Sequence, residues 1–164
     1  MANIKLVPTR MSDIGNIMSW VNDPEVTAYF AWNKQITLEE ERAVLTDLLA
    51  SKNDYLFTIM INGKYAGQCS INKIYWPAKN GRIFMVLKKE FQGKRHAKQI
   101  LELLKEKAFD ELNLHKLWLI VREDNFKGLH IYSRCGFKLE GYLHDEYFVN
   151  GNYLDMLRMA ILNT

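Results

Sequence analysis

Residues 82–121 contain two strand-like apolar runs on either side of a long amphipathic stretch, and no other feature constrains the fold as much. The two runs, Arg82–Leu87 and Lys116–Val121, are rich in β-branched and aromatic residues. Between them, apolar residues recur at helical spacing from Lys94 to Leu112. The pattern predicts a β-α-β unit. The second run is almost wholly apolar, which is typical of a strand buried on both faces.

Two Asn-Gly pairs, Asn62-Gly63 and Asn150-Gly151, predict two hairpins. Asparagine and glycine tolerate the positive φ angles that a tight two-residue turn requires. Each pair lies between two strand-like runs: Tyr55–Ile61 and Tyr65–Ile74 for the first pair, Phe137–Val149 and Tyr153–Leu162 for the second.

Capping residues and helical periodicity predict three more helices. One is capped by Ser12 or Asp13 and ends before Asp23-Pro24, and a second opens with the capping box Thr37–Glu40. A third runs from about Phe126 to Cys135 and stops at Gly136. With a first strand at Ile4–Val7, the predicted order is β-α-α-β-β-β-α-β-α-β-β, which is a mixed α/β fold.

The composition indicates an ordinary globular protein with one domain, residues 1–164. The chain is 48% hydrophobic and 25% charged, with a net charge of +3. This charge favours an anionic ligand, but no basic segment is dense enough to predict nucleic-acid binding. No apolar run is long enough to span a membrane, and no signal peptide is predicted. Two cysteines are too few for a disulfide framework, and they lack the CxxC spacing of a zinc site. A reducing, cytoplasmic location is therefore expected.

A glycine-containing turn, Gln92–Lys98, opens the long helix of the β-α-β unit. The first N–H groups of a helix have no intrahelical acceptor, and the positive end of the helix dipole lies at the same place. Such a turn suits a pyrophosphate, and Lys94, Arg95 and Lys98 add positive charge. An ordinary strand-to-helix turn with solvated basic residues explains the same pattern. The turn matches neither the P-loop nor the GxGxxG motif.

A more specific pattern, Asn125 to Phe137, follows the second apolar run. Its Asn125, Tyr132 and Gly136-Phe137 resemble the N-x-x-A-x-x-x-Y-x-x-x-G-F signature of the GNAT superfamily of acyl-CoA-dependent N-acetyltransferases. Gln92–Ala97 is similar to the pyrophosphate signature of that family, Q/R-x-x-G-x-G/A. The order of elements is also similar, so the resemblance covers essentially the whole chain. It implies a mixed, mostly antiparallel sheet of about seven strands flanked by about four helices.

Two further segments resemble one branch of that family. Trp20–Val26 is similar to the branch that includes ribosomal-protein N-terminal acetyltransferases, and the segment from Glu140 to Tyr153 resembles spermidine acetyltransferases. The aromatic residues Trp20, Tyr29, Phe30 and Trp32 either line an acceptor site or pack the first helices on the sheet.

Three positions depart from the family pattern. Arg95 stands where the pyrophosphate signature has a glycine, and Gly128 stands where alanine is usual. A glycine would let the backbone approach the phosphate closely, so Arg95 either crowds the phosphate or contacts it directly through its guanidinium, with CoA binding retained. Relatives often carry a glutamate, proposed to deprotonate the amine, near the position of Arg82. The identity of the base therefore stays open.

The resemblance implies that the pantetheine arm of acetyl-CoA lies between the strands Arg82–Leu87 and Lys116–Val121, which splay apart. Backbone groups of the first strand would bond the arm and polarise the thioester carbonyl. The turn would hold the pyrophosphate, and Asn125 would contact the cosubstrate from the other side. The implied CoA-binding residues are Met85, Val86, Leu87, Gln92, Gly93, Lys94, Arg95, His96, Ala97, Lys98, Asn125, Lys127 and Gly128.

Two residues are candidates for catalytic roles. Tyr132 is the implied general acid for the departing thiolate, and the alternative is a core tyrosine whose hydroxyl is bonded internally. Glu146 is a candidate for binding or deprotonating the amine, and the alternative is a solvated charge. Cys135 is expected to be a buried structural residue.

These implications predict an acetyl-CoA-dependent N-acetyltransferase in which a primary amine attacks directly within a ternary complex. The acceptor stays open between a polyamine-like amine and an amino sugar on a nucleotide carrier, with a protein N-terminus as a third alternative. A non-catalytic acyl-CoA-binding regulator is the alternative outside enzymes. No metal is expected, because the four histidines lack ligand spacing. The expected partner is a small-molecule amine, not nucleic acid or membrane, and a homodimer or higher homo-oligomer stays open.

Overall fold

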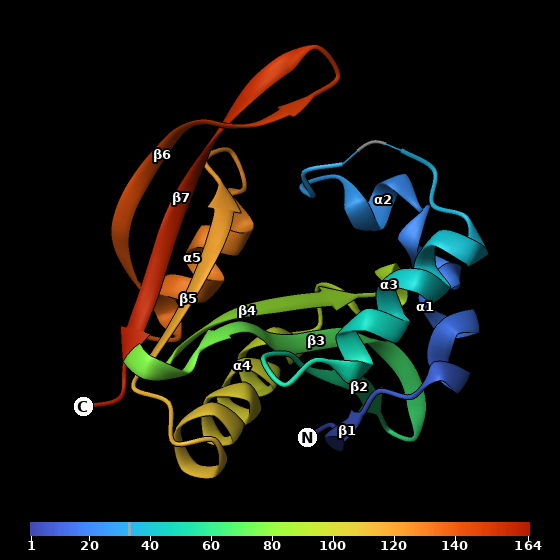
Figure 1. The fold of residues 1–164 in the computed structure, drawn as a ribbon, viewed down its shortest axis with the longest axis horizontal. Helices are drawn as coiled ribbons and strands as arrows, with labels where there is room; N and C mark the ends of the chain where they lie inside the picture. Colours follow the sequence, from blue (N-terminus) through green and yellow to red (C-terminus); the bar gives the residue numbers. More distant parts are fainter. Residues whose placement is uncertain (33) are drawn as a thin grey trace.

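One seven-stranded sheet organises the protein, and helices cover both of its faces (Figure 1). The computed structural model describes residues 1–32 and 34–164. The strand order is β1-β2-β3-β4-β5-β7-β6, and every neighbouring pair is antiparallel except β4 and β5. The strands are β1 (Ile4–Pro8), β2 (Tyr55–Ile61), β3 (Lys64–Tyr75), β4 (Asn80–Leu87), β5 (Lys116–Arg122), β6 (Lys138–Val149) and β7 (Asn152–Leu162). The predicted mixed, mostly antiparallel sheet is confirmed.

The described residues form five α-helices, one more than expected. They are α1 (Ile14–Val21), α2 (Pro24–Thr27), α3 (Leu38–Ala50), α4 (His96–Glu106) and α5 (Phe126–Arg134). The additional helix is α2, a single turn capped by the Asp23 side chain, which accepts a hydrogen bond from the Glu25 N–H at 3.0 Å. The amphipathic stretch continues beyond α4 as one π-helical segment, Lys107–Glu111.

Local signals placed the turns correctly. Asn62-Gly63 and Asn150-Gly151 join β2 to β3 and β6 to β7, with positive φ at all four residues. The Thr37 hydroxyl accepts a hydrogen bond from the Glu40 N–H, and the Glu40 carboxylate accepts one from the Thr37 N–H. This is the predicted capping box of α3.

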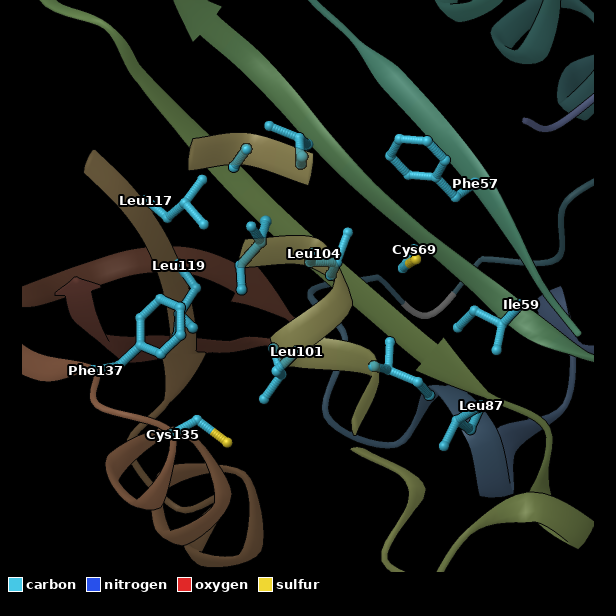
Figure 2. Close-up of a cluster of buried hydrophobic side chains, with 14 of the residues drawn as sticks. Phe57, Ile59, Cys69, Leu87, Leu101, Leu104, Leu117, Leu119, Cys135 and Phe137 are labelled. Carbon is cyan, nitrogen blue, oxygen red and sulfur yellow. The ribbon is translucent and has the colours of Figure 1, made fainter. Parts of the chain in front are cut away.

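The larger core lies between the sheet and the helices α4 and α5. Leu101 and Leu104 of α4 are fully buried against Cys69, Leu117 and other strand residues (Figure 2). Cys135, at the end of α5, belongs to the same core, which confirms its expected structural role. The helix α4 is therefore held firmly against the strands whose ends form the candidate site.

On the other face of the sheet, α1, α2 and α3 pack against β4 in a second, smaller core. Trp20 is buried, and the Phe30 ring lies 5.5 Å from the Phe84 ring of β4. Tyr29 and Trp32 are exposed. The four aromatic residues therefore fall into two pairs. Trp20 and Phe30 pack the helices on the sheet, while Tyr29 and Trp32 remain at the surface.

The expectation that β5 is buried on both faces is wrong. Leu117, Leu119 and Val121 are buried in the main core, whereas the alternate residues Trp118 and Ile120 are only partly buried. The core side faces α4, and the other side lies on the opposite face of the sheet. The apolar run did not predict this, because tryptophan and isoleucine occur equally well on a fully covered face.

The strands β4 and β5 separate after a short contact, as the resemblance implied. Their parallel pairing extends from Asn80 opposite Lys116 to Arg82 opposite Trp118. Residues 83–87 of β4 keep their pairing with β3, and residues 119–122 of β5 keep theirs with β7. The two strands therefore present unpaired backbone edges to each other beyond Arg82. No helix among the described residues is long and apolar enough to cross a membrane.

Candidate functional site

The turn between β4 and α4 is held in place by its first residue. The Gln92 side-chain amide donates a hydrogen bond to the Leu87 carbonyl oxygen at 2.8 Å. Gly93 then adopts a φ of 72°, in the left-handed region that favours glycine. Gln92 thereby fixes the turn against the end of β4, where Met85, Val86 and Leu87 lie beyond the last pair with β5.

The N-terminus of α4 is suited to an anion. No described side chain caps the first turn, and this turn contains no acidic residue. Its free N–H groups and the helix dipole therefore remain available to a negatively charged ligand. Lys94, Arg95 and Lys98 are exposed around this turn, while His96 and Ala97 are half-buried. The structure thus places the predicted pyrophosphate residues together.

Arg95 lies at the N-cap position of α4 with a φ of 64°. This left-handed conformation explains why a glycine is usual at the position, since a side chain there costs about 1–2 kcal/mol. Gly93 already supplies the turn with one unstrained left-handed residue. The conformational strain at Arg95 is therefore confined to this residue, and its positive charge lies at the uncapped N-terminus of α4.

Arg95→Gly is expected to leave the free energy of unfolding unchanged or to raise it by up to about 1 kcal/mol. Relief of the left-handed strain is partly offset by the greater freedom of glycine in the unfolded chain. The matched control is Arg42→Gly on the exposed face of α3, which is expected to lose about 1 kcal/mol. Denaturant unfolding measures the free energy of unfolding of both variants. Equal losses of this free energy for Arg95→Gly and Arg42→Gly contradict the strain at Arg95.

Asn125 acts as the N-cap of α5. Its side-chain oxygen accepts a hydrogen bond from the Gly128 N–H at 3.0 Å. A Cβ atom at position 128 would lie only 2.7 Å from the Asn125 side-chain nitrogen. Gly128 therefore gives the capping amide room, which accounts for the absence of the usual alanine. Lys127 lies in the same first turn of α5 and is exposed.

Tyr132 lies on α5 with its ring against the main core. The ring contacts Phe137 edge to face, with centroids 6.1 Å apart. Burial, and secondarily the nearby Cys135 thiol, raises the pKa of Tyr132 to about 12. Its hydroxyl makes no hydrogen bond within the described part of the chain, although the ring is well packed. The alternative of an internally bonded core tyrosine is therefore not what the structure contains.

Glu146 lies apart from these residues. It is exposed on β6, in the hairpin with β7 that extends beyond the rest of the sheet (Figure 1). Its carboxylate forms no ion pair with a described residue. Neither hydrogen bonds nor ion pairs among the described residues connect Glu146 with Tyr132. Its assignment stays a prediction.

A cavity of about 340 Å³ lies between the α1–α2 region and the tip of the β6–β7 hairpin. Phe30 and Trp32 contribute aromatic surface to it. The ionisable residues among its described lining are both cations, Lys34 and Arg122. Each has a carboxylate partner, Glu40 at 2.6 Å and Asp124 at 2.9 Å. The cavity lies on the face of the sheet opposite α4, at the end of β5 that carries Arg122.

A basic cluster at the point where β4 and β5 separate was missed by sequence reasoning. The guanidinium groups of Arg82 and Arg158 lie 5.8 Å and 4.0 Å from the ring centroid of Trp118. Glu140 accepts hydrogen bonds from Lys116 and Arg158, which hold the pKa of its carboxyl below its usual value. The available signal was the period-two alternation of Lys116, Trp118, Ile120 and Arg122 along β5.

The remaining chemistry-bearing groups lie outside the site. Both cysteines are buried, and burial raises the pKa of each thiol, so neither is a reactive thiolate. The described residues contain no group of three histidine, cysteine, aspartate or glutamate side chains that could hold a metal ion.

The separated strands, the uncapped helix end and the partly buried phenol of Tyr132 are the features expected of an acetyl-CoA-dependent N-acetyltransferase. The chain belongs to the GNAT acetyltransferase family, since the model of the acetyltransferase (GNAT) domain matches residues 3–138. This confirms the resemblance stated from the two signatures.

Relatives that match nearly the whole chain include spermidine acetyltransferases. The spermidine N(1)-acetyltransferase of Escherichia coli is 29% identical over 159 residues, which cover 97% of this chain and 86% of that protein. The structure of the Vibrio cholerae spermidine N-acetyltransferase with CoA and spermine has a TM-score of 0.91 and 26% identity, covering 97% and 95% of the two chains. A dodecameric structure of the Vibrio enzyme in an intermediate state has a TM-score of 0.84, with 26% identity and coverage of 97% and 93%.

Proposed function

We propose that the protein transfers the acetyl group of acetyl-CoA to the primary amine of a small molecule, by direct attack within a ternary complex. The observation that carries this is the opening between β4 and β5, beside the uncapped N-terminus of α4. Unpaired strand edges suit the amide groups of a pantetheine arm, and the helix end suits its pyrophosphate. The Vibrio relative, whose structure contains CoA, supports the use of acetyl-CoA.

In this reaction the amine nitrogen attacks the thioester carbonyl carbon. The C–N bond forms, the C–S bond breaks, and the nitrogen releases one proton to water or a carboxylate. Backbone N–H groups of β4 beyond Arg82 stabilise the negative charge on the carbonyl oxygen. Tyr132 donates a hydrogen bond to the departing thiolate, which finally takes up a proton. Glu146 remains the candidate for binding or deprotonating the amine.

Two acceptor classes have support. The names of the relatives favour a polyamine-like amine. The basic cluster around Trp118 favours an amine that carries an acidic group, such as an amino sugar on a nucleotide carrier. A protein N-terminus is the third alternative.

The test is release of CoA thiol from acetyl-CoA with a panel of spermidine, amino-sugar nucleotides and short peptides. Transfer is expected with one small-molecule class at a rate far above that of hydrolysis. Equal, near-background rates across the panel would instead favour a non-catalytic acyl-CoA-binding regulator, and calorimetry with CoA would then show binding alone.

We also propose that the protein forms a homo-oligomer. The dodecameric Vibrio structure supports self-association. On the β6–β7 hairpin, Phe148 and Tyr153 lie in ring contact at 4.9 Å, and both are more than 60% exposed, at 62% and 65%. Exposed aromatic pairs of this kind are typical of protein interfaces. A sedimentation velocity run that shows only 19.3 kDa particles contradicts this assembly.

A further inference from the structure

We propose that Arg82 selects the acceptor by pairing with an acidic group that the acceptor carries near its amine. The acceptor class is a primary amine that also bears a phosphate or a carboxylate. This inference rests on the proposed function, since it names the substrate of the same reaction.

The position of Arg82 is the first argument. It is the last residue of β4 that faces a partner in β5, and that partner is Trp118. Its neighbours in sequence, Gly81 and Ile83, are buried on the side of the main core. Since side chains alternate along a strand, Arg82 points to the opposite face. It therefore stands at the closed end of the opening, on the face of the sheet opposite the main core.

The second argument is that one donor of the Arg82 guanidinium is buried and unsatisfied. Its Nε atom is buried without a hydrogen-bond partner among the described residues. Its side chain forms neither an ion pair nor a hydrogen bond within the described ranges, and its recorded contact is the face of Trp118. A guanidinium offers five N–H donors in a planar arrangement that matches a carboxylate or phosphate. An acidic group on a ligand would supply the hydrogen-bond acceptors that the described part of the protein does not provide.

The charged side chains around Trp118 favour the binding of an anionic group. Around Trp118 lie the cations Arg82, Lys116 and Arg158, and Glu140 is the single carboxylate among these contacts. Glu140 is already bonded to Lys116 and Arg158, so it leaves Arg82 uncompensated. A polycation such as spermidine would meet repulsion here, whereas an anionic amine would not.

The experiment compares paired acceptors that differ only in the acidic group. The pairs are glucosamine phosphate with glucosamine, and γ-aminobutyrate with butylamine, and spermidine is the polycation. The wild-type protein is expected to prefer the acidic member of at least one pair by tenfold or more in kcat/KM. The pair that shows the preference tells phosphate from carboxylate.

Three variants test whether Arg82 causes the preference for the acidic acceptor. Arg82→Gln is expected to abolish it, mainly through KM, and Arg82→Lys to retain part of it. Arg82→Glu is expected to reverse it and to raise kcat/KM for spermidine above wild type. Arg42→Glu, on the exposed face of α3, makes the same change in net charge and is expected to change nothing. CoA titration and thermal unfolding verify that each variant is folded.

The outcomes separate the two proposals. If no amine releases thiol in the wild type, the proposed function fails. If thiol is released but both pairs react equally, or if folded Arg82→Gln keeps the wild-type preference, the acceptor assignment to Arg82 is overturned while the transferase function stands.

Discussion

Tyr132→Phe is expected to lower kcat at least tenfold and to leave the affinity for acetyl-CoA within about twofold of wild type. The variant removes one hydrogen bond to the developing thiolate, and a hydrogen bond to a charged group contributes about 1.5–3 kcal/mol. The phenyl ring keeps the contact with Phe137, so the fold and the binding surface are preserved. Stopped-flow or steady-state thiol release measures kcat, and calorimetry measures affinity.

The matched control is Tyr75→Phe at the exposed end of β3, which removes a surface hydroxyl from another element and is expected to leave kcat unchanged. An unchanged kcat in Tyr132→Phe would remove this phenol from the mechanism. Because burial raises the pKa of Tyr132 to about 12, the phenol stays protonated from about pH 7 to pH 10. Its titration should therefore not lower kcat in that range.

The raised pKa also defines the role of the phenol. A thiol has an ordinary pKa of about 8.5, so complete proton transfer from a phenol with a pKa of about 12 is uphill by roughly 5 kcal/mol. A hydrogen bond to the thiolate avoids that cost. Tyr132 is thus expected to stabilise the leaving group without passing through a free phenolate.

Gly67→Ala is expected to reduce the free energy of unfolding by about 2 kcal/mol, and the melting temperature by roughly 4–8 °C. A Cβ atom at this position of β3 would lie 2.0 Å from the Val86 carbonyl oxygen. This oxygen belongs to the backbone of β4, so it can move only if the strand moves. Because Val86 lies in the segment proposed to bond the pantetheine arm, the affinity for acetyl-CoA is expected to fall at least tenfold.

The control for Gly67→Ala is Gly141→Ala in β6, where a Cβ atom would meet nothing within 4 Å. Its effect on unfolding is expected to stay within about 0.5 kcal/mol, with CoA affinity unchanged. Thermal unfolding and CoA titration apply to both variants. If Gly67→Ala matches the control in both measurements, the close approach of β3 to β4 does not shape the site.

The sequence was most informative where local chemistry determines local structure. The two Asn-Gly pairs, the Thr37–Glu40 capping box and the Gly136 helix end were each predicted from a few neighbouring residues, and each is present. The signature from Asn125 to Phe137 identified the family and placed Tyr132 on a helix. These features depend on short-range backbone requirements, which a single sequence displays directly.

The features that were missed depend on contacts between distant strands. Arg82 was recognised as a departure from the family pattern, but its stacking on Trp118 needs the register of β4 with β5. Gly67 carries no signal at all, because its importance comes from the Val86 carbonyl nineteen residues away. The short helix α2 has only four residues, too few for any periodicity to show.

The brief contact between β4 and β5 has a mechanical consequence. The continuity of the sheet across its middle depends on a single three-residue junction, and the underlying helix α4 bridges the remainder through its buried leucines. An elongated molecule with its own amide groups, bound in the gap, would serve as the strand that the polypeptide does not supply. Amide hydrogens near the gap should then exchange more slowly in the occupied protein, and the two halves of the sheet should resist separation as one body.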